Sequence, residues 1–279
     1  MELDLRPDAP PAGAMTPFPP GPLLRLARGN LAVDLAPLAG GRIAQIRHDG
    51  IDHLIGPEDG WPAMIAWGCY PMVPWAGRVR HGRFTLGGVE YRLPLNMESH
   101  AIHGVGFALP WALDTHTPES AELSLALPCD ERWPFGGIAR QSIRIEDDRL
   151  HLALSVQAGA GEMPAVIGWH PWFRKPDKLE FSPTRMYPRD HEGLATAPLV
   201  PPTAGPWDDC FLKQGDVVLH RGDRRLRLTS DCTHWVVFDE MEHATCVEPQ
   251  SGPPDAFNLS GQVLAPSETM EHRFTLAWS

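Results

Sequence analysis

The chain has few of the features that mark secreted, membrane-spanning or disulfide-stabilised proteins. Its five cysteines are scattered and form no CxxC pair, so we expect reduced thiols. No stretch approaches the roughly 20 apolar residues that span a bilayer. The N-terminus lacks the basic-then-apolar pattern of a secretory signal. These absences predict a cytoplasmic protein with no membrane partner.

Positive charge is also scarce. Lys and Arg total 24 against 35 Asp and Glu, which gives a net charge of −11. Contacts to a phosphate backbone need clustered basic residues, so this balance argues against a nucleic-acid partner. It suits a neutral or cationic ligand and simple solubility.

Helical periodicity is missing, and period-two alternation takes its place. The clearest example is RLHLALSVQ at residues 149–157, which predicts a half-buried strand. Two hairpins are indicated where Gly87-Gly88 and Asp49-Gly50 separate alternating runs. Proline, at 30 of 279 residues, favours short strands and many loops. We therefore predict an all-β fold, an antiparallel sandwich or barrel.

The domain organisation follows from composition. Residues 1–22, MELDLRPDAPPAGAMTPFPPGP, predict a flexible Pro-rich lead-in. No internal repeat, low-complexity block or linker follows it. Residues 23–279 are therefore predicted to form a single domain, long enough to bury a sizeable core.

Polar and aromatic residues concentrate in a few segments next to turn residues, which we expect to be loops at one end of the sandwich. Taken singly, their titratable side chains have ordinary explanations as ion pairs, buried histidines, strand ends or turn formers. Together they supply charged groups for sugar hydroxyls and a His–Glu pair suited to acid/base chemistry near neutral pH. The five candidates are Arg78, His103, His170, Asp208 and Glu248.

Four of these segments resemble, in order and spacing, the motifs of the aldose 1-epimerase (galactose mutarotase-like) family. PMVPWAGRVRHGRFTLGGVEYRLPLN resembles the stretch that carries an Asn-Arg pair and a hairpin. AIHG and GWHPWFR resemble the two histidine motifs, and CVEPQSGPPDAFN resembles the glutamate motif. The resemblance covers about residues 30–278. It implies a large antiparallel β-sandwich, the galactose mutarotase-like supersandwich.

The resemblance also implies a role for each candidate. Glu248 would be the general base at the anomeric hydroxyl, and His170 the general acid at the ring oxygen. His103 would hydrogen-bond near that oxygen, while Arg78 and Asp208 would hold sugar hydroxyls. The implied activity is interconversion of the α and β anomers of a hexose or related aldose by ring opening and closure. The implied partner is a monosaccharide, with no metal or organic cofactor, and no oligomeric state is predicted.

Two positions depart from the family pattern. Gly77 stands where Asn usually precedes the arginine, and a lost hydrogen bond costs about 1 kcal/mol. The segment PWDDCF at 206–211 matches the aspartate motif loosely, so Asp208 and Asp209 both stay open as the hydroxyl ligand.

Two other functions within sugar chemistry also stay open. A hexose-6-phosphate 1-epimerase would need basic residues for its phosphate, and Arg80, Arg83 and Arg174 are the candidates. A non-catalytic sugar-binding or sensing protein would keep a pocket, but it would not need both His170 and Glu248.

Metal and thiol chemistry are the remaining alternatives. The His100/His103 and His243/Cys246 spacings resemble those of metal ligands, but a three-residue spacing converges on one face only in a helix, and these regions are predicted as loop and strand. A Cys–His nucleophile has less support, because no cysteine has a local setting that indicates a lowered pKa.

Overall fold

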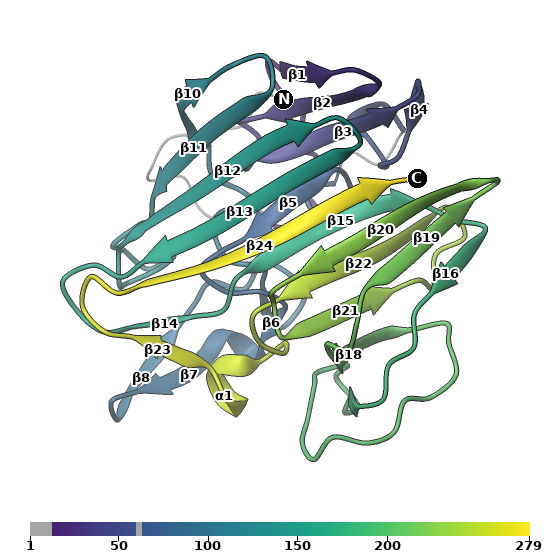
Figure 1. Cartoon of the computed structure of the whole chain (residues 1–279). Coiled ribbons are helices and arrows are strands. Elements are labelled where there is room, and N and C mark those ends of the chain that lie inside the picture. Colours follow the sequence, from purple (N-terminus) through teal and green to yellow (C-terminus); the bar gives the residue numbers. More distant parts are fainter. Residues whose placement is uncertain (1–12, 60–62) are drawn as a thin grey trace.

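The computed structural model describes residues 13–59 and 63–279, and their regular structure is almost entirely β-strand. Figure 1 shows two large antiparallel sheets, one behind the other. The predicted all-β sandwich is therefore confirmed. Within the described residues one sheet has ten strands, in the order β1 (Leu24–Arg28), β2 (Leu31–Ala36), β3 (Arg42–His48), β5 (Cys69–Met72), β15 (Gly168–Arg174), β22 (Ala244–Gln250), β21 (His234–Phe238), β18 (Asp208–Leu212) and β17 (Met186–Tyr187), with β4 (Ile51–Asp52) paired to β3.

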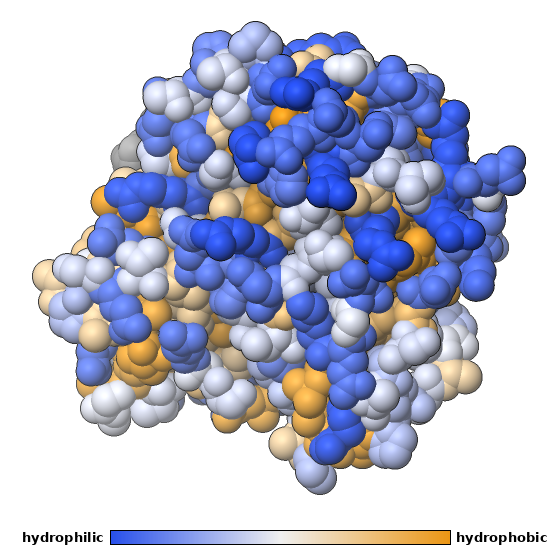
Figure 2. Space-filling model, in the orientation of Figure 1, coloured by the Kyte–Doolittle hydropathy of each residue, from blue (hydrophilic) through white to orange (hydrophobic). Residues whose placement is uncertain are grey.

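The second large sheet contains the longest alternating strands. Within the same described residues it has eight strands, in the order β10 (Ala112–His116), β11 (Ser120–Ala126), β12 (Ile138–Glu146), β13 (Arg149–Gln157), β24 (Thr269–Trp278), β20 (Arg224–Ser230), β19 (Val217–Arg221) and β16 (Lys178–Glu180). The strand predicted at residues 149–157 is confirmed as β13, and its apolar side chains are buried at every second position. Figure 2 shows that the outer face of this sheet is mostly hydrophilic, as period-two alternation requires.

Three short strand pairs and a few helical turns complete the described structure. The pairs are β6 (Arg78–Val79) with β9 (Ala101–Ile102), β7 (Arg83–Leu86) with β8 (Val89–Arg92), and β14 (Met163–Ala165) with β23 (Gln262–Leu264). The helical turns are α1 (Ala256–Leu259), η1 (Pro57–Asp59) and η2 (Arg80–Gly82). Both predicted hairpins are confirmed, as β7–β8 and β3–β4. No helix in the described part of the chain is long and apolar enough to cross a membrane.

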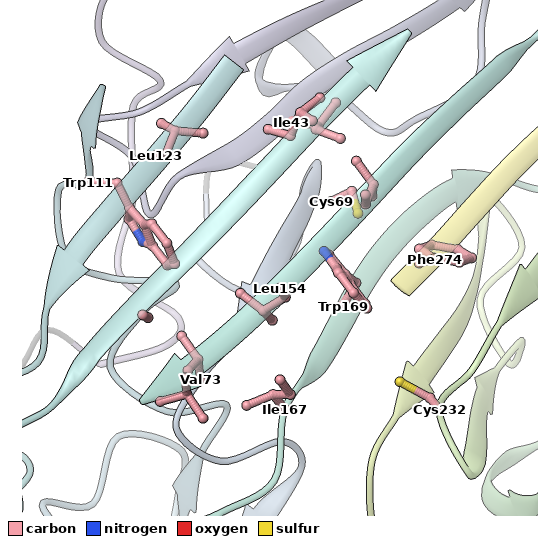
Figure 3. Packing of buried hydrophobic residues seen from close by; sticks show 14 of the residues in the cluster. Ile43, Cys69, Val73, Trp111, Leu123, Leu154, Ile167, Trp169, Cys232 and Phe274 are labelled. Carbon is pink, nitrogen blue, oxygen red and sulfur yellow. The ribbon is translucent and has the colours of Figure 1, made fainter. Parts of the chain in front are cut away.

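The main core lies between the two large sheets. In Figure 3, Trp169 of β15 points toward Phe274 of β24, and their ring centroids are 5.8 Å apart. Residues on either side of Trp169 point the other way, because successive side chains of a strand face opposite surfaces. The opposite face of the ten-stranded sheet carries a second buried cluster, which includes Tyr70, Trp172 and Cys246. The candidate site lies on this opposite face.

The predicted N-terminal lead-in falls partly outside the described structure, because residues 1–12 are not described. In the described remainder, Ala14 and Phe18 are buried in the second cluster. The amide of Ala14 donates a hydrogen bond to the carbonyl of Asn96 at 2.7 Å. The division at residue 22 stays a prediction, and residues 13–22 include parts of the packed structure.

Candidate active site

His170 and Glu248 lie inside strands. The sequence led us to expect loops at their positions, and that expectation is wrong. His170 is the third residue of β15, and Glu248 is the fifth residue of β22. Asp208 begins β18 and Arg78 begins β6, while His103 directly follows β9. The two titratable side chains of the proposed acid/base pair are therefore held by the rigid sheet.

The pair is close because β15 and β22 are adjacent in the sheet (Figure 1). The His170 Nε2 atom lies 3.2 Å from Glu248 Oε1, and the two side chains are almost fully buried. The Gln250 Nε2 amide donates a hydrogen bond of 3.0 Å to the other carboxylate oxygen. That bond fixes the carboxyl plane and leaves one oxygen facing the imidazole.

Aromatic rings hold the His170 imidazole in place. Tyr70, opposite His170 on β5, stacks on the ring with centroids 4.8 Å apart. Trp172, two residues along the same strand, also stacks, at 5.4 Å. The ring of His103 meets the His170 ring edge-on at 5.0 Å. The imidazole thus has little freedom to rotate away from Glu248.

Burial sets the protonation of the pair. It lowers the pKa of His170 to about 3, with a smaller contribution from the Arg42 cation. Burial also raises the pKa of Glu248 well above its usual value, and the Asp208 charge adds to this. Each shift favours the neutral form of its group, so between the lowered pKa of His170 and the raised pKa of Glu248 the pair holds a single proton. A pair with one proton contains one acid and one base.

The backbone around Gly77 orients His103. The Gly77 amide points at His103 Nδ1 at 3.3 Å, and the His103 amide donates to the Gly77 carbonyl at 3.0 Å. Because Nδ1 accepts the hydrogen bond from the Gly77 amide, the neutral ring carries its hydrogen on Nε2. Burial keeps the ring neutral by lowering its pKa well below the usual value, assisted by His170 and Arg78.

The structure explains why position 77 holds a glycine. Gly77 has a φ of +69°, and a Cβ there would lie 2.8 Å from the Cβ of Pro254. A side chain at this position would displace Pro254. Gly77 has no side chain to offer a hydrogen bond, and its backbone amide contacts His103.

Asp208 and Asp209 both face Arg189. The Arg189 Nη1 atom donates to Asp208 Oδ2 at 2.7 Å, and its Nε atom lies 3.2 Å from Asp209 Oδ1. Asp208 is the one whose charge acts on Glu248, and burial raises the Asp208 pKa. Arg78 acts electrostatically on Asp208 and Glu248, and its guanidinium forms no hydrogen bond or ion pair with another described residue.

All five predicted site residues line one cavity. Its volume is about 360 Å³, a size suited to a small molecule. The five residues, each from a separate segment of the sequence, are Arg78, His103, His170, Asp208 and Glu248. Much of the remaining wall is apolar.

The arginines considered for a sugar phosphate lie elsewhere. Arg80 pairs with Asp190 and Glu192, each at 2.6 Å. Arg174 pairs with Asp59 at 2.7 Å. Neither they nor Arg83 line the cavity. A phosphorylated substrate therefore lacks the ligands that the sequence suggested for it.

Neither of the two ligand-like spacings considered as an alternative, His100/His103 and His243/Cys246, forms a three-ligand cluster within residues 13–59 and 63–279. Cys246 instead lies beside His170 and Glu248.

The sequence did not point to two other groups at the site, Gln250 and Arg189. Gln250 could have been found, because it follows Glu248 by two residues in a strand and so shares its face. Arg189 comes from a long connection between β17 and β18, and no sequence signal placed it at the cavity.

The comparison with known families agrees with this geometry. The chain matches the family model described as Aldose 1-epimerase over residues 22–277, and it therefore belongs to that family. Two Escherichia coli K12 proteins, both described as uncharacterized, are similar to it. YihR is 25% identical over 285 residues, which covers 91% of each chain. YphB is 36% identical over 112 residues, and that match spans 38% of this chain and 36% of YphB.

Solved structures show the same fold. A galactose mutarotase-like protein from Clostridium acetobutylicum superposes with a TM-score of 0.83 at 17% identity, covering 92% of this chain and 95% of that one. A putative aldose 1-epimerase from E. coli K12 gives 0.81 at 22% identity, with 92% and 99% covered. The galactose 1-epimerase from Lactobacillus acidophilus NCFM gives 0.77 at 17% identity, with 92% and 98% covered. The predicted family and galactose mutarotase-like fold are confirmed, and the family implies an isomerase-type enzyme with a sugar substrate.

Proposed function

We propose that this chain is an aldose 1-epimerase that interconverts the α and β anomers of an unphosphorylated hexose or related aldose without a cofactor. One observation carries the proposal. A histidine and a glutamate, 3.2 Å apart and holding one proton between them, line a cavity large enough for a small molecule. Ring opening needs an acid and a base at the same time, and this pair supplies both.

The reaction needs two proton transfers in each direction. The proton of the pair first passes from the Glu248 carboxyl to His170 Nε2 across their 3.2 Å contact. The Glu248 carboxylate then removes the proton from the anomeric hydroxyl while His170 protonates the ring oxygen, and the C1–O5 bond breaks to give the open-chain aldehyde. Rotation about the C1–C2 bond presents the other carbonyl face. The ring then closes as the two groups exchange roles, which returns the pair to its starting state with one proton.

The remaining cavity groups bind and orient the sugar. His103 directs an Nε2–H donor toward the reacting oxygens, since its Nδ1 is occupied by the Gly77 amide. Arg78, whose guanidinium forms no ion pair with another described residue, offers it to sugar hydroxyls. Asp208 accepts hydrogen bonds from sugar hydroxyls. We prefer it to Asp209 for this role, because the Asp208 charge acts on Glu248 and raises the Glu248 pKa. The apolar wall suits the C–H faces of a pyranose ring.

A binding-only protein is the less favoured alternative. Burying a carboxyl and an imidazole against each other costs free energy, because each prefers to be hydrated when it is charged. A receptor could satisfy sugar hydroxyls with amides and exposed charges and would not need this pair. Acid/base catalysis, in contrast, requires both groups at the reacting centre.

Polarimetry of freshly dissolved α-D-glucose and α-D-galactose tests the proposal. Purified protein in the presence of a chelator should speed the relaxation of at least one sugar without changing its final rotation. If neither sugar responds, pentoses, deoxy sugars and hexose 6-phosphates follow in the same assay. Acceleration only with a phosphorylated sugar would replace the proposed substrate class, and no acceleration with any aldose would reject the activity.

A further inference from the structure

Cys246 is a third side chain with a potential metal-ligand atom beside the acid/base pair. It lies on β22 two residues before Glu248, so both side chains leave the same face of the strand. Its partner across the ladder is Trp172 of β15, two residues from His170. One potential ligand atom from each of His170, Cys246 and Glu248 lies within 4.8 Å of the others, and all three residues are buried.

These three side chains form a donor set typical of zinc sites. Thiolate, imidazole and carboxylate are the three protein ligands that Zn²⁺ uses, and a tetrahedral ion needs only one more. Bonds of about 2.0–2.2 Å place neighbouring nitrogen and oxygen ligands a little over 3 Å apart. The measured separation of His170 Nε2 from Glu248 Oε1 is 3.2 Å. Because His170 and Glu248 line the cavity, the fourth position is open to water.

Neighbouring residues fix the orientation of two of the three ligands. The Gln250 amide bonds to the Glu248 carboxyl and orients it, as outer groups do at metal sites. Tyr70 and Trp172 fix the plane of the His170 ring.

We propose that His170, Cys246 and Glu248 form a site for a zinc-like divalent cation, and that this ion inhibits the enzyme by occupying both members of the acid/base pair. The inhibition rests on the proposed function, whereas the binding does not. The thiolate favours Zn²⁺ and Cd²⁺ over Mg²⁺ and Ca²⁺, which prefer oxygen ligands.

Charge balances when the ion binds. The Cys246 thiol gives up its proton, and the pair gives up the single proton that it holds. Both protons leave to solvent. The thiolate and the carboxylate then neutralise the two positive charges of the ion, and the neutral imidazole donates its lone pair. The buried site is therefore neutral both before and after binding, which avoids the cost of an unpaired buried charge.

Cadmium binding tests the site without reference to activity. The full chain, stripped with a chelator and desalted, is titrated with Cd²⁺ while the ultraviolet thiolate-to-cadmium band and the heat of binding are followed. Cys246→Ala should lose the band and bind at least about tenfold more weakly, because a ligand is removed. Cys246→Ser keeps the side-chain volume and replaces the alanine variant if that one does not fold.

Two matched cysteine variants serve as controls. Cys210→Ala removes the cysteine that lines the cavity without belonging to the cluster. Cys232→Ala removes the cysteine of a second group, with Asp231 and His272, at another place in the fold. Both should bind Cd²⁺ as the unmodified chain does. Unchanged binding by both Cys246 variants, or loss of the band in Cys232→Ala, would overturn the proposal.

Inhibition is measured separately by polarimetry. Micromolar Zn²⁺ should slow the relaxation catalysed by the unmodified chain, Mg²⁺ should not, and chelator should restore the rate. An active enzyme that binds neither Zn²⁺ nor Cd²⁺ would reject the metal site and leave the proposed function intact. A chain that binds Cd²⁺ through Cys246 but accelerates no sugar would reject the proposed function and the inhibition, and keep the site.

Discussion

The His170–Glu248 pair behaves differently from a histidine and a glutamate in water. With ordinary pKa values, a carboxylate and an imidazolium coexist only between about 4.3 and 6.5. Here burial lowers the pKa of His170 to about 3 and raises that of Glu248. The pair therefore keeps its single proton from the lowered pKa of His170 up to the raised pKa of Glu248.

This wide range predicts the pH dependence of kcat/KM, which reports on the free enzyme. As the pH falls through the depressed pKa of His170, both groups become protonated and the base is lost. As it rises through the raised pKa of Glu248, the acid is lost. We expect kcat/KM, corrected for spontaneous mutarotation, to vary less than about threefold from pH 6 to 8. A tenfold fall across that interval, measured with chelator present, would contradict the shared-proton account.

Arg78 is expected to contribute mainly to binding. Its guanidinium makes no ion pair within the described structure and faces the cavity. Arg78→Ala should raise KM about tenfold or more with little change in kcat, because a charge-assisted hydrogen bond to the sugar is lost in both ground and transition states. Arg83→Ala, on the hairpin outside the cavity lining, is the control. A fall in kcat at constant KM would assign Arg78 to the transition state.

The residue-level chemistry was only partly predictable from the sequence. The resemblance named His170 and Glu248, and both lie at the cavity. Their 3.2 Å approach depends on β15 and β22 being neighbours, although 78 positions separate the two residues in the sequence numbering. Period-two spacing could have named Gln250. Neither Arg189 nor the proximity of Cys246 to His170 is visible in local sequence patterns, because both depend on how distant segments pack.

At the scale of elements, local sequence patterns predicted the hairpins correctly, but they wrongly predicted loops where the site residues lie in strands. Gly87-Gly88 and Asp49-Gly50 determine tight turns through local backbone geometry, so the sequence shows them directly. GWHPWFR and TCVEPQ instead appeared to be loops, because proline and polar residues are rare in central strands. They are nevertheless central strands, since the polar side chains line a cavity on one face of the sheet while Trp169 and Val247 pack in the core on the other.

The β6–β9 pair positions His103 and depends on a glycine. Gly77→Ala should lower the free energy of unfolding by about 1–3 kcal/mol, because the new Cβ meets Pro254 and the φ of +69° disfavours any side chain. Gly87→Ala is the matched control, since its φ is +56° and its Cβ would meet nothing within 4 Å. Chemical denaturation measures both. Equal destabilisation would show that the contact with Pro254 does not matter.

At the scale of the whole molecule, a buried arginine links segments around the site. Arg42 is fully buried, and its guanidinium donates to the carbonyls of Ala39, Met64, Trp67 and Phe107. Burial lowers its pKa to about 9. These four bonds connect Arg42 of β3 to the chain at residues 39, 64, 67 and 107, and they leave the charge without a carboxylate partner in the described structure.

Arg42→Met should therefore destabilise the protein by roughly 3 kcal/mol or more, because four buried carbonyls lose their donor. The midpoint of thermal or denaturant unfolding measures the effect. Arg25→Met, at an exposed position on β1, provides the comparison and should change stability by less than about 0.5 kcal/mol. A similar small change for both variants would mean that water or rearranged backbone replaces the Arg42 bonds.

The central claim is that Glu248 and His170 open and close a sugar ring. The most direct test compares the polarimetric relaxation of the responding aldose with the unmodified chain and with Glu248→Gln, at equal concentration and with chelator present. The amide keeps the shape and still binds sugar, but it cannot accept the proton, so turnover should fall at least about a hundredfold while sugar affinity persists. Relaxation by Glu248→Gln at the rate of the unmodified chain would contradict the account.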